Sequence, residues 1–260
     1  MAVIREKFNR LRRQGRAAFI PYLTFGFPDI RTFESIVLTL DKSGADFIEI
    51  GFPFSDPIAD GPIIQASSAM ALDKGADIYK MFRSLKKIKK KISSPLILMT
   101  YYNPVYAMGL EKFFRLSRGL IDGIVVPDLL VEESADLVKA ARHSRIDTVF
   151  FISPTTQAQR VSLIKKRSSG FIYYISVAGV TGPRKKISPE VIRQAKKLKA
   201  KLGSPLCIGF GVSTRQQARA FKKAFDGVIV GSALISYIFK IYKRKDFLKT
   251  LRKFVLWLNG

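Results

Sequence analysis

Short apolar segments rich in β-branched and aromatic residues alternate with amphipathic helical segments along the whole chain. This alternation is typical of a parallel sheet whose strands are joined by crossover helices. Helical periodicity is clearest at residues 30–44, 78–91, 131–144, 189–202 and 214–225. Eight segments are predicted to be strands: residues 17–25, 46–52, 95–101, 122–127, 147–153, 170–176, 205–210 and 226–231.

Eight such units could form a closed barrel or a large open sheet. Their short, even spacing and the absence of an early GxGxxG motif favour a closed (β/α)₈ (TIM) barrel. The 260 residues match the roughly 250 residues typical of that fold, and no linker divides the chain. We therefore expect one domain over residues 1–260, with an extra N-terminal helix at residues 4–14 closing the bottom of the barrel.

Composition limits the chemistry that the chain can perform. No apolar run approaches the roughly 20 residues of a membrane span, and no secretory signal pattern is present, so a cytoplasmic protein without membrane contact is expected. One cysteine and one histidine argue against a disulfide, a Cys/His zinc cluster and a histidine-based triad. Cys207 is predicted to be a core residue, and His143 is predicted to lie at a solvated helix end. No metal site is predicted.

The chain is strongly basic, with 45 Lys+Arg, 20 Asp+Glu and a net charge of +25. The basic runs at residues 86–91, 165–167, 184–186 and 196–199 are scattered, and most fall late in predicted helices, where cations suit the helix dipole. We therefore favour the interpretation that the basic runs lie on solvated helix faces. The second interpretation is that the positive charge binds an acidic partner surface or binds polyanions non-specifically. A dedicated nucleic-acid function is the least favoured, because no basic motif interleaved with aromatic residues accompanies the charge.

The longest irregular segment follows the second predicted strand, in EIGFPFSDPIADGPIIQ at residues 49–65. Side chains alternate along a strand, so Glu49 points into the barrel mouth if the neighbouring isoleucines face the helices. Burial there would raise the pKa of Glu49 towards the range useful for acid/base work. Asp56 and Asp60 follow in the loop. An ion pair with a barrel lysine is the structural alternative for Glu49, and loop capping is that for the two aspartates.

A second constellation follows the last three predicted strands, at residues 180–182, 209–213 and 231–233. Each is rich in glycine, which lets backbone N–H groups approach a phosphate closely. Barrels that bind phosphates commonly use the loops after strands seven and eight with the N-terminus of a short helix. Ser232 opens such a predicted helix. Tight turns are the alternative for any single glycine, but they explain all three together less well.

These residues resemble the tryptophan synthase α subunit family. EIGFPFSDPIADGPIIQ is similar to the family's signature, and the likeness continues in family order through AAFIPYLTFG, LMTYYNPVY, VPDL, ISPTT, AGVTG, GFGVS and GSALI. The resemblance covers essentially the whole chain. It implies a lyase that cleaves indole-3-glycerol phosphate to indole and glyceraldehyde 3-phosphate in tryptophan biosynthesis.

The resemblance also implies roles for individual residues. Glu49 is similar to the catalytic acid/base, and Asp60 to the carboxylate that engages the indole N–H. Thr181 belongs to a mobile flap, Tyr173 lies beside the substrate, and Asp56 is expected to contact the partner subunit. The indole pocket is implied at Tyr22, Tyr102 and Phe210, and the phosphate site at Gly182, Gly211, Gly231 and Ser232. Val177 and Leu130 depart from commoner family residues, and neither occupies an acid/base position.

The family pattern implies no cofactor in this chain. Pyridoxal phosphate belongs to a separate β subunit, which captures the indole, and an αββα heterotetramer is expected. Two rival readings remain open at this point. One is another phosphate-binding barrel, an isomerase or epimerase, which should lack the pairing of Glu49 with Asp60. The other is a catalytically weak α-like subunit that mainly activates β.

Overall fold

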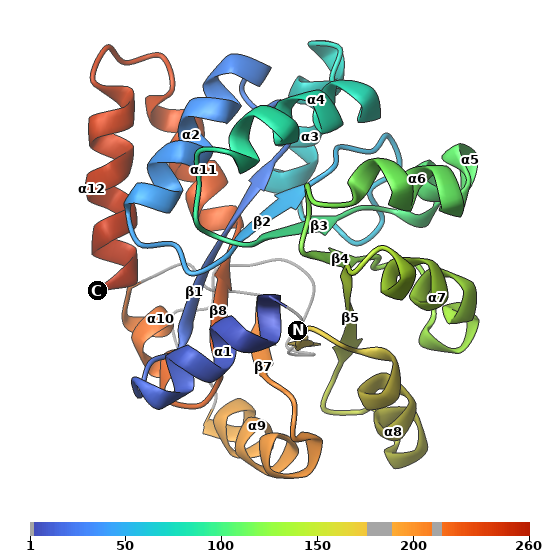
Figure 1. Ribbon diagram of the computed structural model, residues 1–260. Coiled ribbons are helices and arrows are strands. Elements are labelled where there is room, and N and C mark those ends of the chain that lie inside the picture. The colour runs from blue at the N-terminus through green and yellow to red at the C-terminus, as the bar shows by residue number, and fades with distance from the viewer. Residues whose placement is uncertain (1–2, 176–188, 210–214) are drawn as a thin grey trace.

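The computed structural model describes residues 3–175, 189–209 and 215–260. Within these residues eight parallel strands pair in sequence order, and β8 pairs back with β1 to close a barrel (Figure 1). All eight predicted strands are therefore confirmed. The strands are β1 (Ala18–Thr24), β2 (Ile48–Gly51), β3 (Leu96–Met99), β4 (Gly123–Val125), β5 (Asp147–Ile152), β6 (Ile172–Tyr174), β7 (Leu206–Ile208) and β8 (Gly227–Val230).

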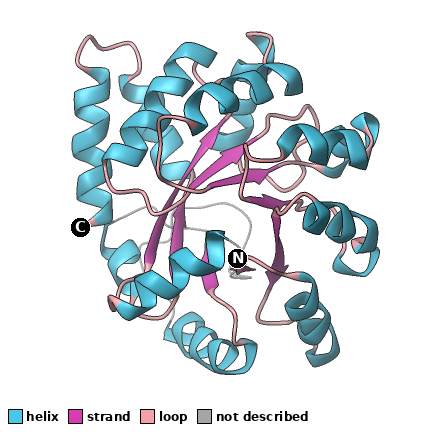
Figure 2. Cartoon of the chain, in the orientation of Figure 1, coloured by secondary structure: helices cyan, strands magenta, loops and turns pink. Residues whose placement is uncertain are grey.

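Helices surround the strands on the outside of the barrel (Figure 2). The predicted helical segments are confirmed, and the structure adds α3, α5, α6, α8 and α12. The helices are α1 (Val3–Arg13), α2 (Ile30–Lys42), α3 (Pro62–Asp73), α4 (Ile78–Lys89), α5 (Tyr102–Met108), α6 (Leu110–Ser117), α7 (Ala135–His143), α8 (Ala158–Arg167), α9 (Pro189–Leu202), α10 (Arg215–Lys222), α11 (Ser232–Ile241) and α12 (Phe247–Asn259), with a 3₁₀ turn η1 (Val131–Glu133).

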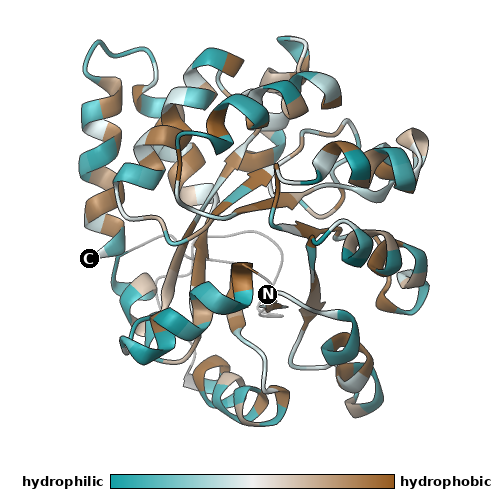
Figure 3. Cartoon of the chain, in the orientation of Figure 1, coloured by the Kyte–Doolittle hydropathy of each residue, from teal (hydrophilic) through white to brown (hydrophobic). Residues whose placement is uncertain are grey.

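Apolar residues fill the barrel and the layer between strands and helices, while the outer helix faces are polar (Figure 3). Cys207 is buried in β7, as predicted, and His143 ends α7 on an exposed face. The last turns of α4 and α8 carry two of the four basic runs, in agreement with solvated helix ends, and the run at residues 184–186 lies outside the described residues. No helix of the described part of the chain has the length and apolar character needed to cross a membrane.

The N-terminal helix α1 lies across one end of the barrel, as predicted (Figure 1). Its buried residues Ile4, Phe8 and Leu11 face inward. Phe8 stacks on Phe47 with ring centroids 4.7 Å apart. The Ile4 side chain lies so close to Gly123, the first residue of β4, that a Cβ there would come within 2.7 Å of it. The helix therefore closes the end of the barrel where the strands begin.

At this same end, the strands are joined in pairs by a repeated pair of hydrogen bonds, which we call a clamp. A side chain just before an even-numbered strand accepts the backbone N–H of a residue near the start of the preceding strand. That residue's carbonyl accepts a backbone N–H in return. The side-chain bonds join Phe19 N to Asp46 (2.9 Å), Leu96 N to Asp122 (2.7 Å), Thr148 N to Ser169 (3.0 Å) and Leu206 N to Asp226 (2.9 Å).

Three of the four clamps use an aspartate, and each of these carboxylates also pairs with a cation. Arg16 contacts Asp46, Lys89 contacts Asp122, and Lys199 contacts Asp226. The three aspartates at this end of the barrel are thus engaged in structural contacts, which leaves the opposite end, where the strands finish, for chemistry. In barrels of this kind the catalytic residues lie at that opposite end.

Candidate active site

Glu49 lies in the middle of β2, where its strand neighbours in register are Tyr22 and Ile97. Its side chain is fully buried, and in the described part of the chain neither carboxylate oxygen has a hydrogen-bond partner. The structure therefore does not support the alternative in which a barrel lysine neutralises Glu49. A buried carboxylate without a donor is costly in its ionised form. Glu49 accordingly has the character of a group kept for proton transfer.

Burial raises the pKa of Glu49 to about 8, and the nearby charge of Asp60 adds to the rise. Burial also raises the pKa of Asp60 to about 6, although the hydroxyl of Tyr101 opposes this by donating to the carboxylate. The two carboxyl groups therefore have different protonation states near neutral pH. Glu49 is mostly protonated and Asp60 mostly ionised, which is the division that acid/base catalysis by two carboxyls requires.

Asp60 is positioned by the loop between β2 and α3. Its carboxylate accepts a hydrogen bond from the Tyr101 hydroxyl at 3.2 Å, and that hydroxyl accepts the N–H of Ala59 at 2.9 Å. Phe54 stacks on the Tyr101 ring with centroids 5.2 Å apart. The residue that caps α3 is Gly61, so Asp60 is not the helix cap. Its side chain is held by Tyr101 rather than used in capping.

Tyr101 is the site residue that sequence reasoning missed. The prediction named the adjacent Tyr102, which begins α5. Its backbone N–H donates to Asp128, and its ring centroid lies 5.9 Å from that of Tyr106. Tyr102 was named from the family resemblance, and the sequence does not show which of two consecutive tyrosines has a hydroxyl that reaches Asp60. A role for Tyr102 in the indole pocket stays a prediction.

Two buried tyrosines complete the apolar surroundings of the carboxyls. Burial raises the pKa of Tyr22 and of Tyr173, and the charges of Asp60 and Glu49 raise them further, which places both rings near the pair. Two glycines make room for their hydroxyls. A Cβ on Gly51 would lie 2.0 Å from the Tyr22 hydroxyl oxygen, and one on Gly209 would lie 2.0 Å from that of Tyr173.

The predicted phosphate site is described in part. Gly231 follows β8 and precedes α11, a ten-residue helix that opens with an exposed Ser232, as the sequence predicted. The first N–H groups of a helix have no partner within it and favour an anion. The other residues assigned to the phosphate, the flap and the indole pocket, namely Gly182, Gly211, Thr181 and Phe210, lie outside the described residues, as does Val177.

Asp56 lies at the exposed tip of the same loop that carries Asp60, where its carboxylate accepts a hydrogen bond from Ser55 at 2.5 Å. This local hydrogen bond agrees with the alternative in which Asp56 stabilises its own loop, and it leaves the carboxylate accessible. In the described part of the chain, no group of three or more His, Cys, Asp or Glu side chains could hold a metal ion.

Comparison with known proteins agrees with this geometry. The sequence profile of the family described as "Tryptophan synthase alpha chain" matches residues 8–255. The chain belongs to the tryptophan synthase alpha chain family. Its membership confirms the expected enzyme class, a lyase of tryptophan biosynthesis, and makes a β subunit its partner.

Relatives and solved structures match nearly the full length. The tryptophan synthase alpha chain of Geobacter sp. (strain M21) is 40% identical over 256 residues, which are 98% of this chain and 96% of that one. That of Thermoanaerobacter sp. (strain X514) is 41% identical over 253 residues, with 97% and 96% covered. The crystal structure of tryptophan synthase subunit alpha from Legionella pneumophila str. Paris has a TM-score of 0.93 at 32% identity, covering 100% of this chain and 97% of that one.

Proposed function

We propose that this chain cleaves indole-3-glycerol phosphate by a retro-aldol reaction in which Glu49 transfers the protons and Asp60 stabilises charge on the indole nitrogen. The observation that carries this assignment is a fully buried, unpartnered Glu49 beside an aspartate held by Tyr101, in a member of the tryptophan synthase alpha chain family. A phosphate-binding isomerase or epimerase would not need this pairing.

The protons balance without a cofactor. Protonated Glu49 gives its proton to C3 of the indole ring, which leaves a cation delocalised onto the ring nitrogen. The resulting carboxylate takes the proton of the hydroxyl on the adjoining side-chain carbon. That hydroxyl oxygen becomes the aldehyde oxygen as the carbon–carbon bond breaks, and the bonding electrons return to the ring. Glu49 ends protonated, as it began, so the group is ready for the next turnover.

Asp60 acts through its charge. A carboxylate that is ionised above pH 6 balances the positive charge that develops at the indole N–H during this sequence. Tyr101 fixes its direction before substrate enters, so little reorganisation is needed in the transition state. The buried rings of Tyr22 and Tyr173 exclude water around the pair. Excluded water strengthens each electrostatic contact inside the site.

We assign the substrate's phosphate to the N-terminus of α11, at Gly231 and Ser232, together with Gly182 and Gly211. A Cβ on Gly231 would meet only ordinary contacts, 3.5 Å from the Tyr22 ring, so this glycine is not required by packing. Gly231→Ala is therefore a fold-neutral probe of the phosphate assignment. It should weaken competition by glycerol phosphate without changing the free energy of unfolding.

We also propose that the face carrying the active site docks on the β subunit, in an αββα heterotetramer whose pyridoxal phosphate lies in β. Exposed apolar side chains follow three consecutive strands on this face: Ile58 (82% exposed) after β2, Tyr106 (70%) after β3 and Leu130 (52%) after β4. Large apolar groups gathered on one face favour a protein interface. Asp56 lies on the same loop as Ile58 and Asp60, so a partner that presses on this loop can move the catalytic carboxylate.

The test of the proposed function is release of indole from indole-3-glycerol phosphate by the purified chain, measured with and without its β subunit. We expect cleavage by the chain alone and faster cleavage after β is added, because docking orders the catalytic loop. Stimulation of β without any cleavage would identify a catalytically inactive activator instead. Cytoplasmic location and a single domain over residues 1–260 remain part of this proposal.

A further inference from the structure

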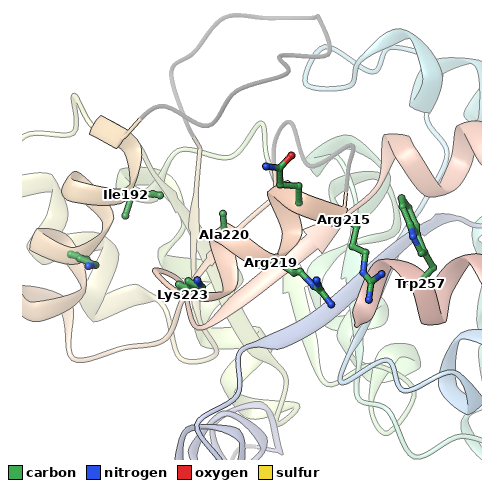
Figure 4. A pocket seen from close by; sticks show the side chains of 8 residues that line it. Ile192, Arg215, Arg219, Ala220, Lys223 and Trp257 are labelled. Atoms are coloured by element: carbon green, nitrogen blue, oxygen red, sulfur yellow. The ribbon is translucent and has the colours of Figure 1, made fainter.

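A groove of about 820 Å³ lies outside the barrel over α10, between α9 and α12 (Figure 4). Its volume falls within the roughly 300–1,000 Å³ typical of small-molecule sites. Four lining residues carry positive charge, Lys196 from α9, Arg215 and Arg219 from α10 and Lys223 just after it, and none of the lining residues is acidic. The groove is separate from the buried pair inside the barrel.

No aspartate or glutamate side chain neutralises the positive charges in this groove. Within the described residues, no ion pair joins any of the four to such a side chain. Helices α10 and α12 contain no acidic residue, and Glu190, the one in α9, is paired with Arg193. Asp226, which follows α10, is paired with Lys199. A concave surface lined by one sign of charge attracts counter-ions.

The two arginines also differ in how their donors are used. Arg219 donates from Nε and one terminal nitrogen to the main-chain oxygen of Gly260, the last residue of the sequence, at 2.8 and 2.5 Å. The Nε of Arg215 is buried and has no hydrogen-bond partner among the described residues. A buried donor without an acceptor is rare and calls for an explanation. Because Arg215 lines the groove, a bound anion would be held by the terminal nitrogens of its guanidinium group.

Trp257 adds an aromatic surface to the groove. It is 47% exposed and stacks on Phe254 with centroids 5.8 Å apart, and Phe254 in turn stacks on Tyr237 at 3.8 Å. This column of three rings fixes the position of the Trp257 side chain. Figure 4 shows Arg215 and Arg219 on the Trp257 side of α10 and Lys223 and Ile192 towards the α9 side. The groove therefore offers a ring platform at one end and cations along its length.

We propose that this groove binds a free nucleotide, with the base stacked on Trp257 and the phosphates held by Arg215, Arg219, Lys196 and Lys223. Aromatic stacking combined with a line of cations is how proteins hold bases and phosphates together. A single ring in a short groove fits one nucleotide rather than a strand, for which several stacking side chains would be expected. An anion without a ring would leave the exposed Trp257 unused.

The chain contains its own comparison site. A second basic groove, of about 530 Å³ between α7 and α8, is lined by Lys139, Arg142, Lys166 and Arg167 but by no Phe, Tyr or Trp, and its one ring is the small imidazole of His143. It has the charge of the first groove without the platform. Any binding that depends on positive charge alone should use both grooves.

Trp257 is the single tryptophan of the chain, so intrinsic tryptophan fluorescence reports on this groove directly. We would titrate the chain with ATP in physiological salt. The expected result is a saturable change in fluorescence, with an affinity about tenfold or more above those of adenosine and inorganic triphosphate, since each lacks one half of the ligand. No saturable change, or equal affinity for ATP and triphosphate, would overturn the proposal.

Variants separate the groove from general charge. Lys196→Gln combined with Lys223→Gln removes two exposed lysines and should weaken ATP binding about tenfold. The matched control, Arg142→Gln with Lys166→Gln, removes the same charge from the second groove and should leave the affinity within about twofold. Trp257→Ala, followed by calorimetry, should also weaken binding. Equal loss in both double variants, or tighter binding of a short single-stranded oligonucleotide than of ATP, would contradict a nucleotide site.

Discussion

At the scale of single residues, the chemistry depends on how two carboxyl groups are surrounded. Glu49 could be identified from its position in the sequence. It is a charged residue in an apolar predicted strand, and the alternation of side chains along that strand directs it into the barrel. The sequence could not show that the Glu49 carboxyl lacks hydrogen-bond partners, since this depends on which side chains the folded barrel brings near it. Tyr101 was missed for the same reason. Two consecutive tyrosines look alike until the structure shows which hydroxyl reaches Asp60.

The raised pKa of Glu49 has a consequence for stability. Between the pKa of about 4.5 in the unfolded chain and about 8 in the folded chain, only the unfolded state releases the proton, so stability falls as pH rises through this range. Glu49→Gln removes this effect. The variant should gain several kcal/mol over the parent at pH 9 and much less at pH 5, at about 1.4 kcal/mol for each unit of pKa difference. Urea unfolding at both pH values measures it, and an equal difference at both would contradict a buried, protonated Glu49.

Tyr101 and Tyr102 form a matched pair for a second test. Tyr101→Phe removes the hydrogen bond that lowers the pKa of Asp60, so the acidic limb of the pH–rate profile should move to higher pH and turnover should fall about tenfold. Tyr102→Phe leaves that bond intact and should leave the acidic limb in place. Profiles of kcat/KM for both variants decide between them. A limb that moves as far in Tyr102→Phe as in Tyr101→Phe would show that the Tyr101 hydroxyl does not set the pKa of Asp60.

At the scale of elements, the alternation of apolar and amphipathic segments was sufficient to place all eight strands. It did less well where a helical pattern is short or interrupted. Helix α5 spans seven residues and contains Pro104, and Gly109 at φ 83° separates it from α6, so neither gives a long periodic signal. The clamps were also missed, because an aspartate before a strand resembles any turn residue until its partner N–H is known.

Loss of a clamp should lower the free energy of unfolding, and by more where the accepting side chain is an aspartate than where it is a serine. Asp226→Ala leaves the backbone N–H of Leu206 without its acceptor and removes the pairing with Lys199, so it should lower the free energy of unfolding by about 1.5–3 kcal/mol. Ser169→Ala removes a neutral acceptor and should cost about 0.5–1.5 kcal/mol. Denaturant unfolding of both variants tests the order. An Asp226→Ala variant no less stable than Ser169→Ala would show that the carboxylate adds nothing beyond the hydroxyl.

At the scale of the whole molecule, the fold separates stability from function. Clamps and α1 occupy the end of the barrel where strands begin, and the carboxyl pair and exposed apolar groups occupy the other end. The large positive charge lies mainly on the outer helix faces, where the sequence placed it. Composition gave the size of this charge, but it could not show that some of it lines grooves.

Charge should also affect assembly. With +25 on this chain, association with an acidic β surface should be faster at low ionic strength and slower as salt screens the attraction. Ligands of the α site should tighten the complex by the same factor by which β tightens their binding. Stopped-flow association of the two purified subunits at several salt concentrations measures the first effect. A rate that does not change with salt would remove electrostatics from the encounter.

The central claim is that Glu49 and Asp60 together cleave indole-3-glycerol phosphate, and its most direct test is the pH dependence of indole release by the parent chain and by Glu49→Gln. For the parent we predict a bell-shaped kcat/KM with limbs near pH 6 and 8, because Asp60 must be ionised and Glu49 protonated. Glu49→Gln should lose at least about 10²–10⁴-fold in turnover at every pH. Indole release by Glu49→Gln within about threefold of the parent, a much smaller loss than removal of an acid/base group causes, would contradict the claim.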